Sequence, residues 1–156
     1  MDKWNEWNEW FTSRNGGGFT YESGHTFLQT CDKIEIWGCL GVDGNKTDLT
    51  KYISHVDGIY MRHVLEHNDE WKLILENACK SFLKKMCLVL CTPFSGGNGT
   101  KDIACRGNGP PDLSFDKNEL EYEFEKYHIH HELITMNTET GYGIEHVFYL
   151  TKSSKC

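Results

Sequence analysis

The middle of the chain alternates between apolar, strand-like runs and an amphipathic helix pattern. Val56–Met61 and Met86–Cys91 are the apolar runs, and the second is apolar throughout, which is typical of a strand covered on both faces of a sheet. Residues 69–83, which lie between them, carry apolar side chains at helical spacing. Because parallel strands need a long crossover connection, this segment predicts neighbouring strands of a mainly parallel α/β sheet.

Three further segments extend this pattern. Ile34–Trp37 alternates in polarity and predicts a strand, and Asp116–Tyr127 predicts an acidic helix. Ile129–Met136 and Ile144–Leu150 predict two strands joined as a hairpin. We therefore expect residues 1–156 to form a single α/β domain that ends in an antiparallel hairpin.

Two segments stand outside the sheet pattern. Residues 1–18 carry Trp4, Trp7 and Trp10 at every third position, a spacing that predicts one face of a helix. Such a stripe indicates a core or docking face, or a lid if it lies over a pocket. Residues 95–114 are rich in Gly, Asn and Pro, and loops of this length are usually functional or mobile.

Composition narrows the function classes. The chain of 156 residues has a formal charge of -7, with 23 acidic against 16 basic residues, which argues against general nucleic-acid binding. Its longest apolar run is far shorter than the roughly 20 residues of a membrane-spanning helix. The seven cysteines form no C-x-x-C pair, and the amino terminus shows no secretory pattern. We expect a reducing, cytoplasmic setting rather than a disulfide scaffold.

Three stretches resemble the class I S-adenosylmethionine (SAM)-dependent methyltransferases. Residues 57–70, with the run V-L-E-H at 64–67, are similar to that family's fourth strand and the following helix start. Lys84–Phe94 is similar to the fifth strand and its T-P loop, and Leu40–Asp43 to the second strand. The resemblance covers most of residues 34–150. It implies a Rossmann-like, mainly parallel sheet, SAM as cofactor, and methyl transfer to a small-molecule or macromolecular acceptor.

The family's glycine-rich loop and first crossover helix are largely missing. Only residues 37–41 separate Ile36 from Val42, whereas a parallel crossover needs a dozen or more residues. The two strands must form one bent strand or a tight hairpin, or the first strand lies elsewhere, or another segment replaces the loop. The resemblance is thus to a trimmed methyltransferase without the first crossover helix.

The resemblance also implies which residues hold the cofactor. Asp43 corresponds to the acid that accepts hydrogen bonds from the ribose, and Asp48 to one that receives the adenine amino group. The alternatives are a turn aspartate at 43 and a helix cap at 48. Gly38 and Cys39 are the remnant of the loop beside the methionine part. Three residues after the central strand are expected to line the crevice: Met61, Arg62 and His63.

The acceptor side is implied in the same way. His67 is the candidate catalytic residue, because imidazole can remove a proton near neutral pH. The expected substrate-binding residues are Thr92, Phe94 and Trp10, with the tryptophan segment and the loop 95–114 closing over them. A structural alternative for His67 is a hydrogen bond that fixes the turn between strand and helix.

Two other functions compete with methyl transfer. His63 to His67 also match H-x-x-E-H, in which two histidines on one helical face bind Zn²⁺ and Glu66 acts as base. That hypothesis needs a helix across the motif, whereas the helix pattern begins at Asn68, so we predict no metal site. The other alternative is a non-catalytic module of the same fold that binds a partner.

Overall fold

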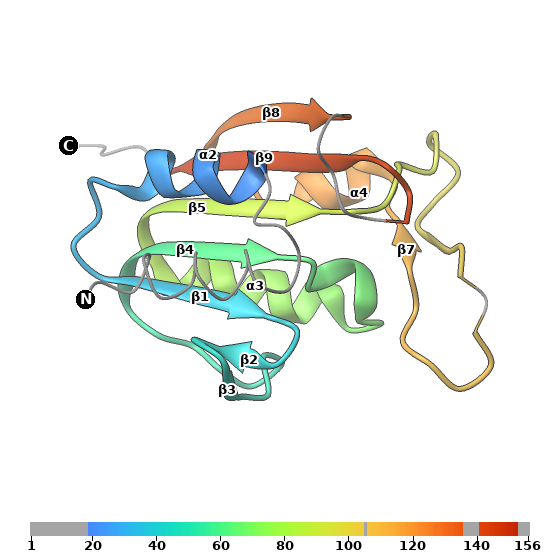
Figure 1. Cartoon of the computed structure of the whole chain (residues 1–156), viewed down its shortest axis with the longest axis horizontal. Coiled ribbons are helices and arrows are strands. Elements are labelled where there is room, and N and C mark those ends of the chain that lie inside the picture. Colours follow the sequence, from blue (N-terminus) through green and yellow to red (C-terminus); the bar gives the residue numbers. More distant parts are fainter. Residues whose placement is uncertain (1–18, 105, 136–140, 153–156) are drawn as a thin grey trace.

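The computed structural model describes residues 19–104, 106–135 and 141–152. Its main feature is a seven-stranded sheet in the order β3-β2-β1-β4-β5-β9-β8 (Figure 1). The strands of this sheet are β1 (Ile34–Gly38), β2 (Gly41–Val42), β3 (Asn45–Lys46), β4 (Val56–Arg62), β5 (Phe82–Leu90), β8 (His128–Ile134) and β9 (Glu145–Thr151). The other elements are α2 (Phe19–Leu28), the 3-10 helix η1 (Leu65–His67), α3 (Trp71–Ser81), α4 (Lys117–Tyr122), and the two-stranded ribbon of β6 (Lys101–Asp102) and β7 (Leu113–Ser114).

The centre of the sheet is parallel and its carboxyl-terminal side is antiparallel. β1 pairs with β4 and β4 with β5 in parallel, and α3 connects the last two. β9 pairs antiparallel with both β5 and β8. This arrangement confirms the predicted α/β fold, with its mainly parallel, Rossmann-like sheet and terminal hairpin.

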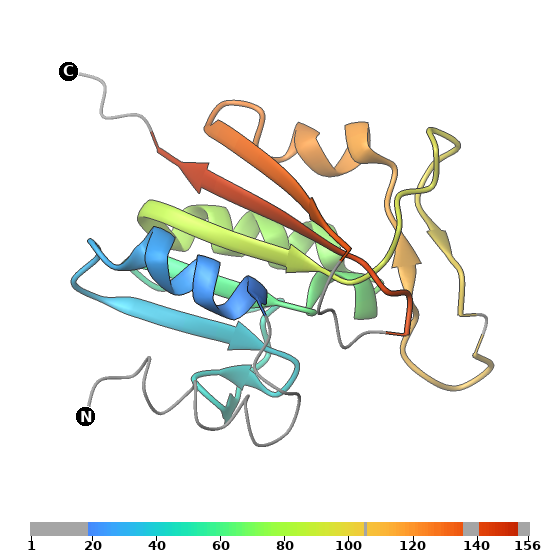
Figure 2. The ribbon, with the colours of Figure 1, turned by 45° about the horizontal axis from the view of Figure 1, so that its top comes forward.

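Side chains alternate between two apolar layers, one on each face of the sheet. On β4, Ile59 and Met61 pack in the larger cluster with residues of α3, whereas Tyr60 packs on the opposite face with Leu28 of α2. Figures 1 and 2 show α2 on one face and α3 with α4 on the other. Gly24 allows the close approach of α2, because a Cβ there would clash with the Tyr60 ring.

A tight hairpin takes the place of the first crossover helix. Trp37 pairs with Val42 and Gly38 with Gly41, so β2 turns straight back along β1. Asp43 then closes the turn: its N–H donates to the Ile36 carbonyl oxygen at 2.7 Å, and its Oδ1 accepts from the Ile36 N–H at 2.9 Å. Of the arrangements that the short spacing left open, the hairpin is the one that occurs.

Some local expectations were wrong or fall outside the described residues. The helix expected from Asn68 onward begins later: α3 starts at Trp71, with Glu70 as an N-cap that forms no side-chain hydrogen bond. α4 ends at Tyr122, although its expected start is confirmed by Asp116, which accepts from Asn118 N–H. The loop 95–114 carries the β6–β7 ribbon. Trp10 and the segment 1–18 lie outside the described residues.

The described residues contain no helix that is both long and apolar enough to span a membrane.

Candidate functional site

A cleft opens where the parallel strands end. The chain leaves β1 toward one edge of the sheet and β4 toward the other, so the strand order reverses between these two neighbours. Ligands of open α/β sheets bind at such reversals, outside the carboxyl ends of the strands. A cavity of about 990 Å³ lies at this place. Its lining includes Cys39 after β1, Arg62 at the end of β4, His63 and His67 after β4, and Cys91 after β5.

A buried carboxylate contacts both the last residue of β4 and the residue that follows it. Glu145, at the start of β9, is 1% exposed, and its Oε2 lies 3.3 Å from Nη2 of Arg62 and 2.7 Å from Nε2 of His63. Removing either charged partner of such a buried pair is strongly destabilising. His63 itself has a φ of 56°. This left-handed backbone conformation is uncommon for residues other than glycine, and such outliers cluster at functional sites.

The opposite wall of the cleft is held by Asp112. Its carboxylate receives two hydrogen bonds from Arg106, at 3.0 and 3.2 Å, and one from the Tyr142 hydroxyl at 2.7 Å. Nδ1 of His67 lies 3.1 Å from Asp112 Oδ1 and 3.1 Å from the Pro111 carbonyl oxygen. Asp112 therefore ties the loop before β7 to the motif after β4.

The protonation states of Asp112 and Tyr142 follow from the same contacts. Burial opposes ionisation of Asp112, but hydrogen bonds from Tyr142 and Arg106 and the charge of Arg106 outweigh it and lower the pKa of the carboxyl. The hydrogen bond to Asp112 raises the pKa of Tyr142 to about 12. Asp112 is therefore an anion near neutral pH.

Replacing Asp112 with alanine is expected to lower the local stability of residues 101–114. Arg106, Tyr142 and His67 lose their common acceptor, so amide hydrogen exchange in residues 101–114 should become at least about tenfold faster. Exchange mass spectrometry measures this directly. Asn108→Ala, an exposed change in the same loop, should leave the rates as they are. Equal protection in Asp112→Ala and the unchanged protein would contradict the role of this carboxylate.

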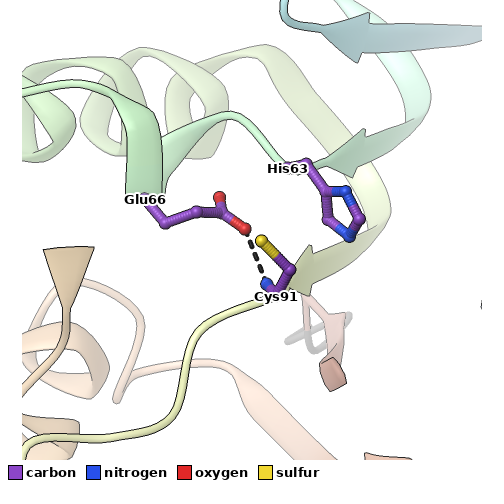
Figure 3. Close-up of side chains that lie close together, drawn as sticks. All are labelled: His63, Glu66 and Cys91. Carbon is purple, nitrogen blue, oxygen red and sulfur yellow. Dashed lines mark hydrogen bonds between the residues drawn. The ribbon is translucent and has the colours of Figure 1, made fainter. Parts of the chain in front are cut away.

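Next to the cleft, a buried hydrogen bond joins the 3-10 helix to Cys91, the residue after β5. Glu66 is fully buried, and its Oε2 accepts from the Cys91 N–H at 2.6 Å (Figure 3). Burial, followed by the charge and hydrogen bonding of Glu66, raises the pKa of the Cys91 thiol. A thiol with a raised pKa is a poor nucleophile at neutral pH, so Cys91 is not an activated cysteine.

Four of the predicted site residues come together at the cleft: Cys39, Arg62, His63 and His67. Gly38 ends β1, and a Cβ there would have no described atom within 4 Å. Asp43 follows the β1–β2 hairpin and closes it by accepting a hydrogen bond from the Ile36 N–H. Its predicted contact with a ribose stays a prediction.

The other predicted residues are placed elsewhere. Asp48 lies in an exposed turn and accepts from the N–H and hydroxyl of Thr50. Met61 is fully buried in the core. Thr92 donates its hydroxyl hydrogen to the Leu113 carbonyl oxygen, and Phe94 stacks on His146 with ring centroids 3.8 Å apart. None of these is among the cleft-lining residues of the described chain, so their predicted contacts with cofactor or substrate stay predictions.

The helical zinc-site geometry does not form in the described residues. His63 precedes η1 with a left-handed backbone, and His67 is bound to Asp112 and Pro111 instead of facing His63 across a helix turn. The premise of the H-x-x-E-H alternative is therefore wrong.

Sequence reasoning missed the residues that come from the later loops. Arg106, Asp112 and Tyr142 lie in Gly- and Pro-rich surroundings without periodicity. One feature of the sequence pointed to Glu145: it is a charged residue within an apolar strand, and a buried charge requires a partner. Cys91 was taken only as the end of an apolar run.

The fold matches solved methyltransferases over nearly the whole chain. The N-methyltransferase NodS from Bradyrhizobium japonicum, in complex with S-adenosyl-L-homocysteine, has a TM-score of 0.60 at 11% identity, with 94% of this chain and 93% of that chain covered. The fold is that of the class I methyltransferases. The magnesium protoporphyrin IX methyltransferase ChlM from Synechocystis, with bound SAM, has a TM-score of 0.52 at 9% identity and covers 98% of both chains.

Other comparisons limit what can be inferred from this similarity of fold. In two further matches this chain spans only about half of the other chain: 49% of a second ChlM structure, with bound SAH, and 50% of a 1,6-didemethyltoxoflavin-N1-methyltransferase from Burkholderia thailandensis. The latter has a TM-score of 0.50 at 12% identity and matches 70% of this chain. No protein-family model and no curated protein matches the sequence. Because the neighbours' acceptors differ, the fold does not identify an acceptor.

Proposed function

We propose that the protein binds SAM in the cleft and transfers its methyl group to an acceptor. One observation carries the proposal: in a methyltransferase fold, the cavity lies at the carboxyl ends of β1, β4 and β5, where the strand order reverses. Its volume of about 990 Å³ is at the upper end of the range for small-molecule sites, roughly 300–1,000 Å³. A cofactor and part of an acceptor can share such a space.

The residues after β1 fit a nucleoside cofactor. The open space around Gly38 allows a ligand to approach the backbone closely. Asp43 uses Oδ1 to hold the hairpin, but a carboxylate has about four acceptor positions. In this proposal the Asp43 carboxylate accepts from the ribose hydroxyls while Oδ1 keeps its bond to the Ile36 N–H. The bound cofactor supplies an activated methyl group, whose transfer depends mainly on positioning and exclusion of water.

His67 fits the role of proton acceptor. Both neighbours of Nδ1, the Pro111 carbonyl oxygen and Asp112 Oδ1, are acceptors, so Nδ1 carries a proton and donates it. Nε2 is then the nitrogen that can remove a proton, as in hydrolase triads where a carboxylate fixes the tautomer. We infer an acceptor whose attacking atom loses a proton, a small molecule or a macromolecule.

Cofactor binding is expected to raise the melting temperature of the protein. A ligand at 100-fold above its Kd adds about 2.7 kcal/mol to the free energy of unfolding. Thermal unfolding with SAM and with S-adenosylhomocysteine measures the shift. Asp43→Asn keeps an oxygen for the Ile36 N–H but removes the negative charge. It should weaken binding by about tenfold or more, since hydrogen bonds to charged groups contribute roughly 1.5–3 kcal/mol.

The control is Glu125→Gln, an exposed change away from the cleft lining, which should bind both ligands as the unchanged protein does. Normal affinity in Asp43→Asn would place the nucleoside elsewhere. No thermal shift at millimolar ligand would contradict cofactor binding altogether.

A non-catalytic binding module is the second candidate, and the hairpin after β1 favours it. In place of a glycine loop and a helix, the chain turns back as β2 and β3. Loss of cofactor binding would leave the fold intact as a platform for a partner. The absence of any thermal shift with either ligand would support this candidate. Cytoplasmic location and the lack of general nucleic-acid binding stay predictions.

A further inference from the structure

We propose that His63, Glu66 and Cys91 form a binding site for a divalent transition-metal ion of the Zn²⁺ type. One potential ligand atom from each side chain lies within 4.8 Å of the others. Figure 3 shows the Glu66 carboxylate and the Cys91 thiol directed toward one another, with the His63 ring beside them. The sequence predicted no metal here, because the H-x-x-E-H motif pairs His63 with His67 and needs a helix that the pattern starts only at Asn68, and because Cys91 ends an apolar run.

The spacing is close to what a metal ion requires. With Zn–N and Zn–O bonds of about 2.0–2.2 Å and Zn–S bonds of about 2.3 Å, tetrahedral ligand atoms lie roughly 3.3–3.8 Å apart. The three atoms, which lie at most 4.8 Å apart, need only a small inward movement to meet this spacing.

Glu66 provides the independent observation that something is to be bound here. Its side chain is fully buried, and its Oε2 holds the Cys91 N–H. Its Oε1 is also buried and has no hydrogen-bond partner among the described residues. An unpaired buried carboxylate oxygen is costly. A metal ion at this oxygen would remove the cost.

The surroundings of His63 also suit a metal ligand. A carboxylate beside a metal-bound imidazole fixes the orientation of the ring, and Glu145 lies 2.7 Å from Nε2 of His63. The left-handed backbone at His63 directs the chain out of β4 at this point, and such backbone outliers cluster at functional sites. A bound metal ion deprotonates a coordinating thiol, so Glu66 and a Cys91 thiolate would bring two negative charges to the ion, while Arg62 balances Glu145.

The ligand atoms indicate which metal ion the site favours, and the cleft indicates that one coordination position is open. A thiolate, an imidazole and a carboxylate favour Zn²⁺ over Mg²⁺ or Ca²⁺, which prefer oxygen ligands. His63 and Cys91 both line the cleft, so a fourth ligand, water or a bound molecule, can enter from that side. Sites with three protein ligands and one open position are those that take part in ligand binding or chemistry.

The test is a titration of the purified full chain with Co²⁺, followed by competition with Zn²⁺. We expect one ion per chain and a thiolate-to-cobalt charge-transfer absorption that Zn²⁺ abolishes. Cys91→Ser should remove this absorption. Glu66→Gln, which keeps an acceptor for the Cys91 N–H, and His63→Asn, which tolerates the left-handed backbone, should each weaken binding at least tenfold.

The matched control is Cys39→Ser, which removes the other cleft thiol of the described chain and should leave the absorption unchanged. Circular dichroism verifies that each variant is folded. The proposal is overturned if no stoichiometric binding occurs, if the absorption persists in folded Cys91→Ser, or if it is lost in Cys39→Ser instead. The titration contains no SAM, so its outcome is independent of the proposed methyl transfer.

Discussion

Phe148→Ala is expected to lower the free energy of unfolding by about 3–5 kcal/mol, the usual cost of removing a buried aromatic ring. Phe148 is fully buried on β9. Its ring meets Phe124 edge-on with centroids 5.4 Å apart and lies parallel to His131 at 4.5 Å. The cavity would open between the sheet and the segment after α4. Urea denaturation followed by circular dichroism measures the loss.

The control lies on the neighbouring strand. Leu133 of β8 is 53% exposed, so Leu133→Ala should change stability by no more than about 0.5 kcal/mol. If Phe148→Ala cost less than about 1 kcal/mol, the packing between β9 and the region of α4 would be weaker than the structure indicates.

Acidification is expected to destabilise the protein through His146. Burial, together with the nearby His131, lowers the pKa of His146 to about 4, whereas the unfolded chain has the ordinary value near 6.5. Between these values the unfolded state binds more protons, so the free energy of unfolding falls as the pH falls. The stabilisation is complete above about pH 6.5, and about 3 kcal/mol is lost by pH 4. Denaturant unfolding at a series of pH values gives the slope.

His146→Phe separates this group from other acid effects. It keeps an aromatic ring for the stack with Phe94 but cannot take up a proton. The slope between pH 6.5 and 4 should become shallower. Some slope remains, because burial also lowers the pKa of His131, whose Nε2 lies 2.9 Å from Nδ1 of His146. His128→Gln, at an exposed position on β8, should reproduce the original slope. An identical slope in His146→Phe would rule out His146 as the source.

Periodicity and spacing were sufficient to predict the framework of the fold. The apolar runs at 56–61 and 86–91 became β4 and β5, with α3 between them, because burial on both faces leaves few alternatives to a central strand. The short spacing between Ile36 and Val42 predicted the missing helix for a geometric reason, the length of a crossover. The start of α3 was less predictable, since Asn68 forms a different hydrogen bond, to the Val64 carbonyl oxygen.

The candidate site was predictable only where local sequence carries it. His63 and His67 follow β4 directly, and the motif brought them into view. Their partners, Glu145 and Asp112, arrive from distant segments through the sheet order and the loop before β7. No local pattern encodes such pairings. The buried Glu66 illustrates the same limit, because its contact with Cys91 depends on the alignment of β4 with β5.

The β2–β3 hairpin has a consequence for solubility. Without it, β1 would present a row of unpaired backbone groups at the border of the sheet, a template onto which another molecule could add a strand. β3 is instead the outermost strand, and it comprises only the exposed residues Asn45 and Lys46. Very short border strands that carry lysine resist strand addition. The segment that replaces the crossover helix therefore also protects the end of β1, at Trp37 and Gly38, from strand addition.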